Sequence, residues 1–593
     1  MTRKILNACA LCGCLVAAGA SAAVKDGVYT SSVPAHNAPI TVQVTFGDNK
    51  ITAIKVIKDL ESRGIGKLAI DKLTHHMLQT QSVAVDGITG ATFTSFALKK
   101  AVSDCILQAG GDENDFSKEV DLYPHYDETI DTQVVIVGGG GAGLAAAISA
   151  QQHGANVVIL EKMGYLGGST NVNGGGFNAV DPKRQIPQGI EDSIEKFYKQ
   201  TLEGGHNTGD PKLVRYMIDN AYPTIEWLES LGVQFKDALT TGTGALWQRT
   251  HVGTTPTGNH YIKALEKYVA EHADQISVFF DTDVKQLVRD KSGRITGVMA
   301  NNHGRTLRVN ASKGVILATG GFAANIPMRQ KYNTGIWKEV KLDAHIGASP
   351  IAKAAQGDGI VMGQKVGAAL TNMSDIQLHP NGDPKTGLMI GLSTRGRNCL
   401  FINEEGNRFV NEGAARDVLS KAIFQQPHQT YWLMVNKVRY PARDWMDAEG
   451  YTANDLLEQK LIVTADTLEE LAAKMNVDPQ NLKRAVDEYN EVVTGKVQKD
   501  RHGFVSNNTA DKPMTEGPWY AQKKVPTIHH TMGGLKISTN NEVLGKNGQP
   551  IKGLYAVGEV TGGIHGSNRL GGNANTDIFT FGRHVGEVVA NQK

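Results

Sequence analysis

The segment from Asp86 to Thr92 (Asp-Gly-Ile-Thr-Gly-Ala-Thr) combines residue types that suit covalent attachment of a phosphate-bearing group. A phosphoester needs a hydroxyl on an accessible loop, small neighbours that let the phosphate approach the backbone, and an acidic residue for a modifying enzyme to recognise. The segment has all three. The sequence therefore predicts modification of Thr92, with Thr94 as the second candidate. The alternative is an ordinary Gly-Thr turn between two elements.

A second chemical motif, Gly138–Gly143, lies between two apolar stretches. Gln133–Val137 runs directly into the glycines, an alanine-rich helical segment follows, and Asn156–Leu160 ends at Glu161. Glycines let the backbone close on a pyrophosphate at a helix N-terminus, and the acid is placed to bind a ribose hydroxyl. This pattern predicts a dinucleotide site. Two later apolar stretches, 315–321 and 553–559, favour non-covalent FAD over a nicotinamide, because flavoproteins of this fold return to the cofactor at such strands.

Four side chains in the second half of the chain suit recognition of a carboxylate: His379, Arg416, His529 and Arg569. With the run Asn403–Asn411, they closely resemble the soluble fumarate reductase and urocanate reductase family of flavoproteins. The resemblance covers almost everything after the first two dozen residues. The segment ending at Thr92 in turn resembles the flavinylation motif of FMN-binding domains in sodium-pumping quinone reductases, which implies covalent FMN at Thr92.

The resemblance implies reduction of a C=C bond activated by a carboxylate. Arg569 offers a planar fork that matches a carboxylate, and His529 adds a second donor. By resemblance, Arg416 gives a proton to the other carbon, His379 contacts the substrate, and Arg395 remains for reloading the proton. A buried core histidine is the alternative for His379.

For Arg416 the alternative is an ordinary ion pair at a helix start, with Asp417 or Glu412. No metal site is expected. The resemblance also implies a set of FAD contacts, namely Gly138, Gly140, Ala142, Gly143, Glu161, Lys162, Gly168, Ser169, Thr170, Gly175, Gly176, Thr319, Gly320, Asp358, His530, Glu559, Arg569 and Ala574. Trp247, His251 and His260 lie in a Gly/Thr-rich stretch that is a candidate for the substrate entrance.

The chain departs from the family where fumarate reductases place Thr-Glu after a Met-Val pair. Here Met389-Ile390 is followed by Gly391-Leu392. Loss of the hydroxyl removes a charge-assisted contact worth roughly 1.5–3 kcal/mol, and leucine solvates a second carboxylate poorly. We therefore expect Gly391 and Leu392 to favour a substrate with an apolar alkyl or aryl substituent, such as a cinnamate-like acid. Restoring Thr and Glu there is expected to favour fumarate.

These motifs imply an α/β protein with a Rossmann-like FAD-binding domain, split by an inserted α+β capping domain and preceded by a small α+β FMN-binding domain. Alternation over Ile40–Phe46 and Ile51–Ile57 predicts a hairpin, and a helix is expected over Ser95–Ala109. The expected boundaries are a signal peptide at 1–23, the FMN-binding domain at 24–110, a linker at 111–130, the FAD-binding domain at 131–374 and 529–593, and the capping or substrate domain at 375–528.

The N-terminal residues indicate export to the periplasm by a Sec-type signal peptide. Arg3 and Lys4 precede an apolar stretch that ends at the small residues Ala20-Ser-Ala22, and no later apolar run is long enough to span a bilayer. The balance of 61 basic against 60 acidic residues shows no nucleic-acid footprint. A monomer that acts on a small molecule is expected, and without a Cys-x-x-Cys-His motif covalent haem is not.

The leading hypothesis is an exported reductase of 2-enoates in anaerobic respiration, with electrons passing through FMN to FAD. Its electron donor would be a quinol dehydrogenase or a periplasmic cytochrome, and a flavin transferase would attach the FMN. Urocanate reductase or fumarate reductase is the alternative enzyme. A flavin electron carrier that has lost catalysis is the alternative class, against which the retention of Arg416, His529 and Arg569 argues.

Overall fold

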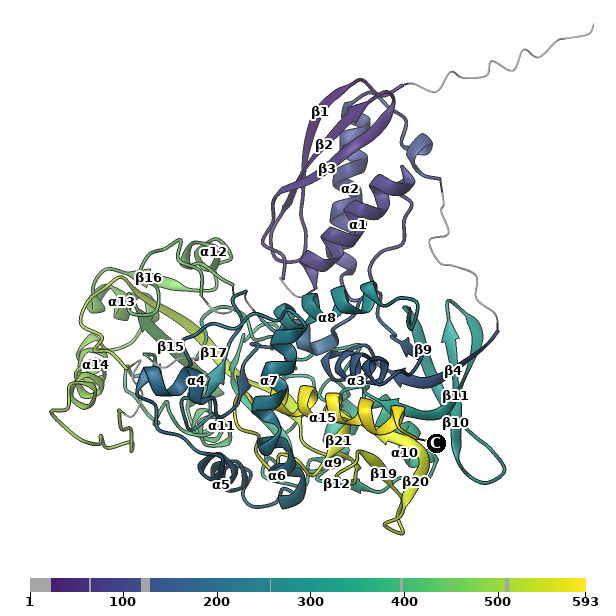
Figure 1. Cartoon of the computed structure of the whole chain (residues 1–593). Helices are drawn as coiled ribbons and strands as arrows, with labels where there is room; N and C mark the ends of the chain where they lie inside the picture. Colours follow the sequence, from purple (N-terminus) through teal and green to yellow (C-terminus); the bar gives the residue numbers. More distant parts are fainter. Residues whose placement is uncertain are drawn as a thin grey trace, which may run out of the picture. The chain divides into compact units, whose positions relative to one another are not determined.

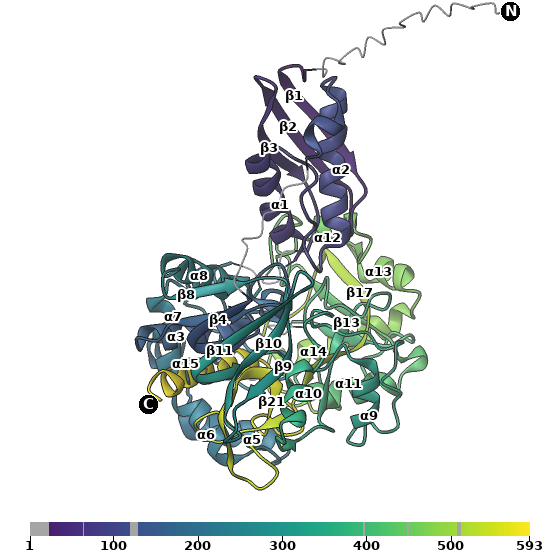
Figure 2. The same cartoon turned by 90° about the vertical axis from the view of Figure 1, so that its right-hand side faces the viewer.

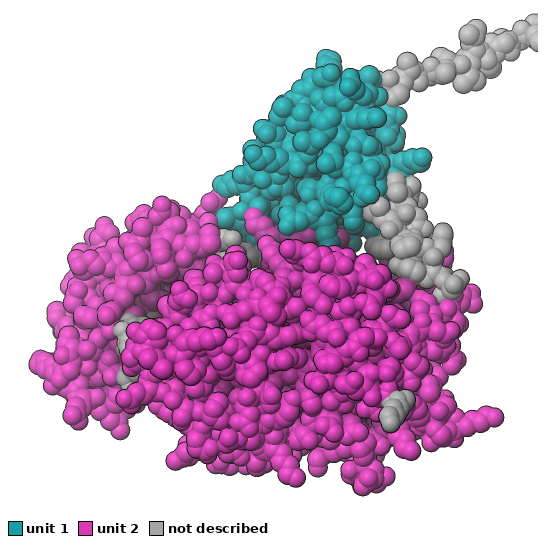
Figure 3. All heavy atoms as spheres, viewed as in Figure 1, with its two compact units in different colours: residues 1–61, 69–87, 92–124 teal, residues 62–68, 88–91, 125–593 magenta. Residues whose placement is uncertain are grey.

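The structure is a computed structural model that describes residues 23–62, 65–118, 128–255, 257–394, 398–447, 450–506 and 511–592. Residues 1–22 of the expected signal peptide lie outside the described residues. The chain forms two compact units, one of residues 1–61, 69–87 and 92–124 and one of the remainder (Figure 3). Within the described residues, no helix is both long and apolar enough to cross a membrane.

The first unit is a three-stranded antiparallel sheet packed against a long helix (Figure 1). Its order is β1 (Gly27–Val33), β2 (Ile40–Gly47), β3 (Lys50–Lys58). Strand β2 alternates strictly, and Ile40, Val42, Val44 and Phe46 are buried. Helix α2 (Thr92–Gln108) covers this face with its own buried residues, among them Leu98, Val102 and Ile106.

Two further helices complete this unit, and one of them lies in the expected linker. They are α1 (Gly66–Thr80) and the 3-10 helix η1 (Glu113–Phe116). Phe116 is buried, and its ring lies edge-on to that of Phe46 with the centroids 6.2 Å apart. Phe46 in turn lies edge-on to Tyr29, with the centroids 5.8 Å apart. The first residues after 110 therefore pack with the sheet and extend the unit beyond residue 110.

The larger unit is built on a sheet of eight strands (Figure 2). The main path runs β19–β20–β11–β4–β5–β8, and β20, β11, β4, β5 and β8 are mutually parallel. Parallel strands buried on both faces are expected to be continuously apolar, as Val134–Val137 and Val157–Leu160 are. The strands span β4 (Thr129–Val137), β5 (Val157–Leu160), β8 (Ile276–Phe279), β9 (Thr282–Arg289), β10 (Ile295–Asn302), β11 (Arg305–Leu317), β19 (Glu542–Leu544) and β20 (Pro550–Ala556).

Helices α3 (Gly141–Gln152) and α15 (Asn573–Ala590) pack closely against each other although more than 400 residues separate them in sequence. Glycines on α15 permit the approach. A Cβ at Gly582 would lie 2.7 Å from the Cβ of Ala145, and one at Gly586 would lie 2.4 Å from the carbonyl oxygen of Ala146. The C-terminal helix thereby covers the helix that follows the glycine turn.

A second sheet of five antiparallel strands comes from residues between the two parts of the eight-stranded sheet. Its order is β13–β17–β15–β14, with β16 also paired to β17. The elements are β13 (Ile376–Gly382), β14 (Leu400–Ile402), β15 (Tyr431–Asn436), β16 (Val463–Ala465), β17 (Trp519–Thr531), α11 (Arg416–Phe424), α12 (Ala453–Glu458), α13 (Leu468–Met475) and α14 (Pro479–Val493).

The remaining elements lie along the chain between those already described. They are α4 (Pro182–Gln185), α5 (Ile194–Gly204), α6 (Pro211–Asp219), α7 (Ala221–Ser230), α8 (Asn259–Glu271), α9 (Ile326–Tyr332), α10 (Asp358–Lys365), β6 (Phe177–Asn178), β7 (Thr250–His251), β12 (Leu370–Thr371), β18 (Gly534–Lys536), β21 (Thr561–Gly562), η2 (Gly168–Val172), η3 (Ile186–Gln188), η4 (Pro427–Gln429) and η5 (Gly558–Val560).

Candidate active site

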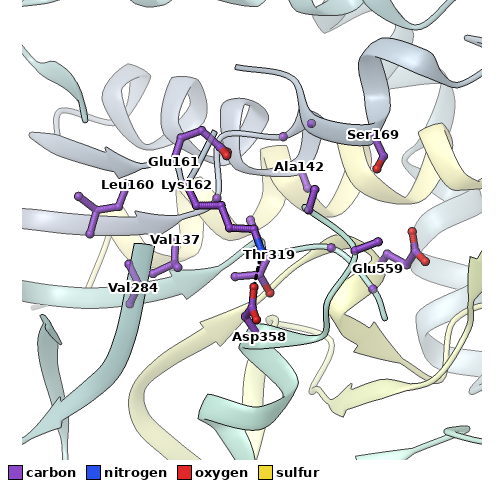
Figure 4. Close-up of a pocket in the computed structure, with 18 of the residues that line it drawn as sticks. Val137, Ala142, Leu160, Glu161, Lys162, Ser169, Val284, Thr319, Asp358 and Glu559 are labelled. Carbon is purple, nitrogen blue, oxygen red and sulfur yellow. Dashed lines mark hydrogen bonds and ion pairs between the residues drawn. The ribbon is translucent and has the colours of Figure 1, made fainter. Parts of the chain in front are cut away.

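A first cavity opens at the carboxyl ends of β4, β5 and β11, where the glycine turn begins α3 (Figure 4). Gly138 has φ +106°, and a Cβ there would lie 2.5 Å from the carbonyl oxygen of Ala318. A Cβ at Gly143 would lie 1.9 Å from the carbonyl oxygen of Gly138. Only glycine fits either position, so the turn keeps bare backbone N–H groups at the start of a helix, as a pyrophosphate requires.

The acid predicted to bind a ribose closes one side of this cavity. Glu161 accepts hydrogen bonds from the backbone N–H groups of Gly139 and Met163, each at 2.7 Å. A carboxylate has about four acceptor sites, so each oxygen retains one for a ribose hydroxyl. Burial raises the pKa of Glu161. Across the cavity, Lys162 pairs with Asp358. The glycine cradle and this acid fit an adenine dinucleotide such as FAD.

The structure places most of the expected FAD contacts around this cavity. Those lining it are Gly138, Gly140, Ala142, Glu161, Lys162, Gly168, Ser169, Thr170, Thr319, Gly320, Asp358 and Glu559. Gly143 packs inside the turn, and His530 is buried with its Nδ1 3.5 Å from Glu559 Oε2. Gly175, Gly176, Arg569 and Ala574 line a second cavity instead. Gly141, Gly321 and Thr282 line the first cavity and were not anticipated.

The second cavity brings together the four side chains that the sequence singled out. It is lined by Asn173, Gly174, Gly175, Gly176, Gly242, Thr243, Thr250, His379, Met389, Ser393, Arg416, His529, Arg569, Gly572, Ala574 and Asn575. These include two guanidinium groups and two imidazoles, and none of the described lining residues is acidic. Such a cavity favours an anion, because two guanidinium groups and no acidic side chain are among its described lining residues.

Arg569 is the most deeply desolvated cation of this cavity. It is 3 % exposed, its Nη1 donates to the carbonyl oxygen of Leu570, and its buried Nε has no hydrogen-bond partner among the described residues. Burial lowers the pKa of Arg569 to about 10, although the negative charges of Glu559 and Asp577 act to raise it. The side chain is therefore still a cation at neutral pH, with donor capacity left for a bound carboxylate.

His529 lies beside His379, with ring centroids 4.9 Å apart. Burial, with the charges of Arg416 and other nearby groups, holds the pKa of His529 well below its usual range. The ring is therefore neutral near pH 7. Its Nδ1 is 2.8 Å from the hydroxyl of Ser349. If that hydroxyl donates, Nε2 carries the proton and can donate to a substrate oxygen.

Arg416 begins helix α11, and two hydrogen bonds fix its guanidinium. Nε donates to the carbonyl oxygen of Thr243 at 3.0 Å, and Nη1 donates to Oε1 of Gln377 at 2.8 Å. The acids proposed as alternative partners are engaged elsewhere. Glu412 receives two hydrogen bonds from Arg408, and Asp417 lies 2.9 Å from Nε2 of His206. The side chain thus lines the cavity in one held orientation.

Gly391 and Leu392 are not among the residues that line either cavity. Leu392 is fully buried in an apolar cluster with Phe401, Leu419 and Tyr431. The Cβ position at Gly391 falls 2.2 Å from Oε1 of Gln522, which accepts the N–H of Leu392. Met389 and Ser393 line the second cavity in their place, and the expected Arg395 lies outside the described residues.

The Gly/Thr-rich stretch contributes to the cavity through smaller residues than those singled out. Gly242, Thr243 and Thr250 line it. His251 is instead fully buried against Asp181, at 3.0 Å. The hydroxyl of Thr243 lies 2.5 Å from that of Thr394, next to Ser393. The glycine and threonine content of 240–250 was the available signal, but the packing that turns individual residues inward is not visible in the sequence.

In the first unit, the hydroxyls near the phosphoester motif differ in accessibility. Thr92 is exposed at the first position of α2. Thr94 is 2 % exposed, and its Oγ1 donates to Glu61 at 2.7 Å. Ser95 is 3 % exposed. Only a hydroxyl that reaches solvent can be modified without unfolding the helix, so the geometry favours Thr92 over Thr94.

Comparison with known proteins agrees with both cofactor sites. Residues 133–574 match the family described as FAD binding domain, and residues 36–107 match the family described as FMN-binding domain. The chain therefore combines an FMN-binding domain with an FAD-binding domain, and residues of the latter line both the dinucleotide cavity and the cation-lined cavity.

The chain belongs to the family of flavin-dependent fumarate and urocanate reductases. It is 37 % identical to the NADH:acrylate oxidoreductase of Vibrio harveyi over 95 % of this chain and 61 % of that one. It is 34 % identical to the urocanate reductase of Eggerthella lenta, covering 95 % and 92 %. A flavocytochrome c3 fumarate reductase in an open conformation superposes with TM-score 0.61 at 34 % identity, over 80 % and 83 % of the two chains. The chain thus spans about three fifths of the length of the Vibrio relative.

Proposed function

We propose that this protein reduces the C=C bond of a 2-enoate monocarboxylate with an apolar substituent or none. One observation carries the proposal: a buried cavity with two arginines, two histidines and no acid among its described lining residues. Its remaining wall consists of glycines, Ala574, Met389 and short polar side chains. One carboxylate is matched by the Arg569–His529 pair, and Met389 offers an apolar contact for a substituent.

The proposed roles of this chain's residues follow from their geometry. Bound FAD would supply a hydride equivalent to the substrate C=C bond. Arg569 and neutral His529 hold the carboxylate and stabilise the enolate-like charge that develops on it. Arg416, fixed by Thr243 and Gln377, gives a proton to the carbon that does not receive hydride. Glycines on one wall let the flavin and substrate approach closely.

The name of the Vibrio relative supports a small monocarboxylate, because acrylate carries one carboxylate and no substituent. We further propose FMN in phosphoester linkage to Thr92, attached by a flavin transferase. We also propose that the protein is a monomer exported to the periplasm. Its electron donor would be a quinol dehydrogenase or a periplasmic cytochrome. The stretch 375–528 would cap the flavin as an insertion in the FAD-binding domain.

A substrate screen with reduced viologen dye tests the proposed function. Acrylate, crotonate, methacrylate and cinnamate vary the substituent on one carboxylate, while fumarate adds a second carboxylate and urocanate an imidazole. The expected result is a higher kcat/KM for at least one monocarboxylate with an apolar or absent substituent than for fumarate or urocanate. Preference for fumarate would assign the distal carboxylate to His379, and preference for urocanate would assign the imidazole to the Ser393 end. Either outcome would overturn the proposal.

A further inference from the structure

Two phenylalanines on helix α2 are unusually exposed for their size. Phe93 is 72 % exposed and Phe96 is 67 % exposed. A single exposed apolar side chain needs no explanation. These two are neighbours on one helix, at spacing i, i+3, and both lie within about one helical turn of Thr92.

The first turn of α2 sorts its side chains into two sets. Thr94 and Ser95 are buried, and Ala97 and Leu98 are fully buried in the core of the unit. The hydrogen bond from Thr94 to Glu61 holds this rotation of the helix. Thr92, Phe93 and Phe96 consequently form one exposed face, which combines a free-standing hydroxyl with two aromatic rings.

We propose that Phe93 and Phe96 form a stacking platform for the isoalloxazine ring of an FMN carried on Thr92. The inference rests on the proposed phosphoester at Thr92 and assigns the place of the ring. A ring tethered through a phosphate and a ribityl chain can fold back over one helical turn, about 5.4 Å of rise. Offset or edge-on aromatic contacts then cover the two phenyl groups and favour an ordered ring over a freely swinging one.

The flavin is a better match to this patch than a protein partner. Stable protein interfaces bury about 800 Å² on each partner, whereas this face consists of two apolar side chains. The polar residues that follow are engaged within the unit: Lys99 donates to the carbonyl oxygen of Val85, and Lys100 pairs with Asp104. A single tricyclic ring is the size of group that two neighbouring phenyl groups can cover.

Fluorescence of the full-length, FMN-loaded protein tests the platform, with the Thr92→Ala protein measured in parallel to subtract the emission of FAD. A ring stacked on the helix rotates with the protein, so the slow component of the FMN anisotropy decay measures the fraction of stacked ring. In Phe93→Ala/Phe96→Ala this component should shrink, with the ratio of stacked to free ring falling about tenfold, since each aromatic pair is worth about 0.5–1.5 kcal/mol. Leu107→Ala is the matched control, because Leu107 is 51 % exposed on the same helix.

A tryptophan substitution gives an independent readout of contact. Phe96→Trp should quench FMN emission, because excited flavin oxidises a tryptophan that touches it, whereas Leu107→Trp should leave it unchanged. The intact mass of the protein tests the phosphoester separately from the platform. Absence of FMN from Thr92 would refute the phosphoester itself. FMN present on Thr92, with unaltered anisotropy in the double alanine variant and no quenching in Phe96→Trp, would overturn the platform alone.

Discussion

At the scale of single residues, Arg416 is the side chain on which the proposed proton transfer depends. Arg416→Ala should lower kcat by at least about a hundredfold, the smaller end of the usual effect of a positioned acid. FAD content should not change, because Arg416 is not among the residues lining the dinucleotide cavity. Arg416→Lys should also be poorly active, because an ammonium group cannot make the two hydrogen bonds of the guanidinium with the same geometry. Steady-state kinetics and bound-flavin absorbance check both variants, and near-normal turnover of Arg416→Ala would refute the role.

The depressed pKa of His529 makes a prediction about pH. Since the free enzyme holds His529 neutral, kcat/KM should not fall with deprotonation of this ring between about pH 6 and about pH 8. A histidine of ordinary pKa that was required as a cation would lose more than about tenfold over the same interval. The pH profile of kcat/KM distinguishes the cases. A tenfold decline that disappears in His529→Gln would mean that the cation is the working form.

Gly391 illustrates a residue whose importance is steric. A threonine there would adopt φ +84° and place its Cβ 2.2 Å from Gln522 Oε1. The simple reversal to the fumarate-reductase sequence is therefore expected to destabilise the protein, not to install fumarate specificity. Gly391→Thr should lose about 1–3 kcal/mol from backbone strain plus a further loss from displacing Gln522. Gly495→Thr is the control, because Gly495 has φ +76° and nothing within 4 Å of its Cβ position. Equal losses in denaturant unfolding would show that the contact with Gln522 is unimportant.

At the scale of elements, the contact between α3 and α15 depends on glycine. Gly586→Ala places a methyl group 2.4 Å from the carbonyl oxygen of Ala146 and 2.7 Å from the Cβ of Ser149. The helices must separate, with an expected loss of about 1–3 kcal/mol and weaker FAD retention, since α3 starts at the glycine turn. Glu587→Ala, at an exposed neighbouring position, should be nearly neutral. Unfolding midpoints and flavin release on dilution measure the two effects, and equal stability of the two variants would contradict this packing argument.

Elements with strong periodicity were predictable from the sequence, and weakly patterned ones were not. The expected hairpin is present as β2 and β3, and the expected helix begins three residues early, at Thr92. Strand β1 was not anticipated. Its sequence, Gly-Val-Tyr-Thr-Ser-Ser-Val, has few apolar residues, and it is half-buried through pairing with β2. Local sequence does not encode that pairing.

The residues of the candidate site also divide into those that a local sequence pattern predicts and those that only tertiary packing places. The glycine turn and Glu161 carry their chemistry in local spacing, and they line one cavity as expected. Gly242 and Thr243 line the second cavity through the tertiary arrangement of their loop, so no local pattern marks them. For Leu392 the local sequence was misleading. Its position in a family motif predicted a contact with the substrate, but its side chain packs into an apolar cluster.

At the scale of the whole molecule, the chain matches both an FMN-binding domain and an FAD-binding domain, and the proposed function takes electrons from the first flavin to the second. Thr92→Ala should therefore abolish turnover with the physiological donor, supplied as quinol-reduced membranes, by removing the flavin that accepts its electrons. Small reduced viologens reach FAD without that flavin, so dye-driven turnover and FAD content should be retained. Thr92→Ser keeps a hydroxyl at the exposed helix start and should recover part of the FMN.

Fragment-ion masses within the peptide of residues 89–95 locate the FMN, and Thr92 is the expected position because the hydroxyl of Thr94 is buried and donates to Glu61. FMN on Thr94, or full donor-coupled turnover in Thr92→Ala, would refute the assignment of Thr92 as the point where the donor's electrons enter. Loss of both donor-driven and dye-driven turnover would instead mean that Thr92→Ala disturbs the protein beyond electron entry, and would also refute the assignment. Retention of the dye-driven rate alone is the result that a two-stage route requires.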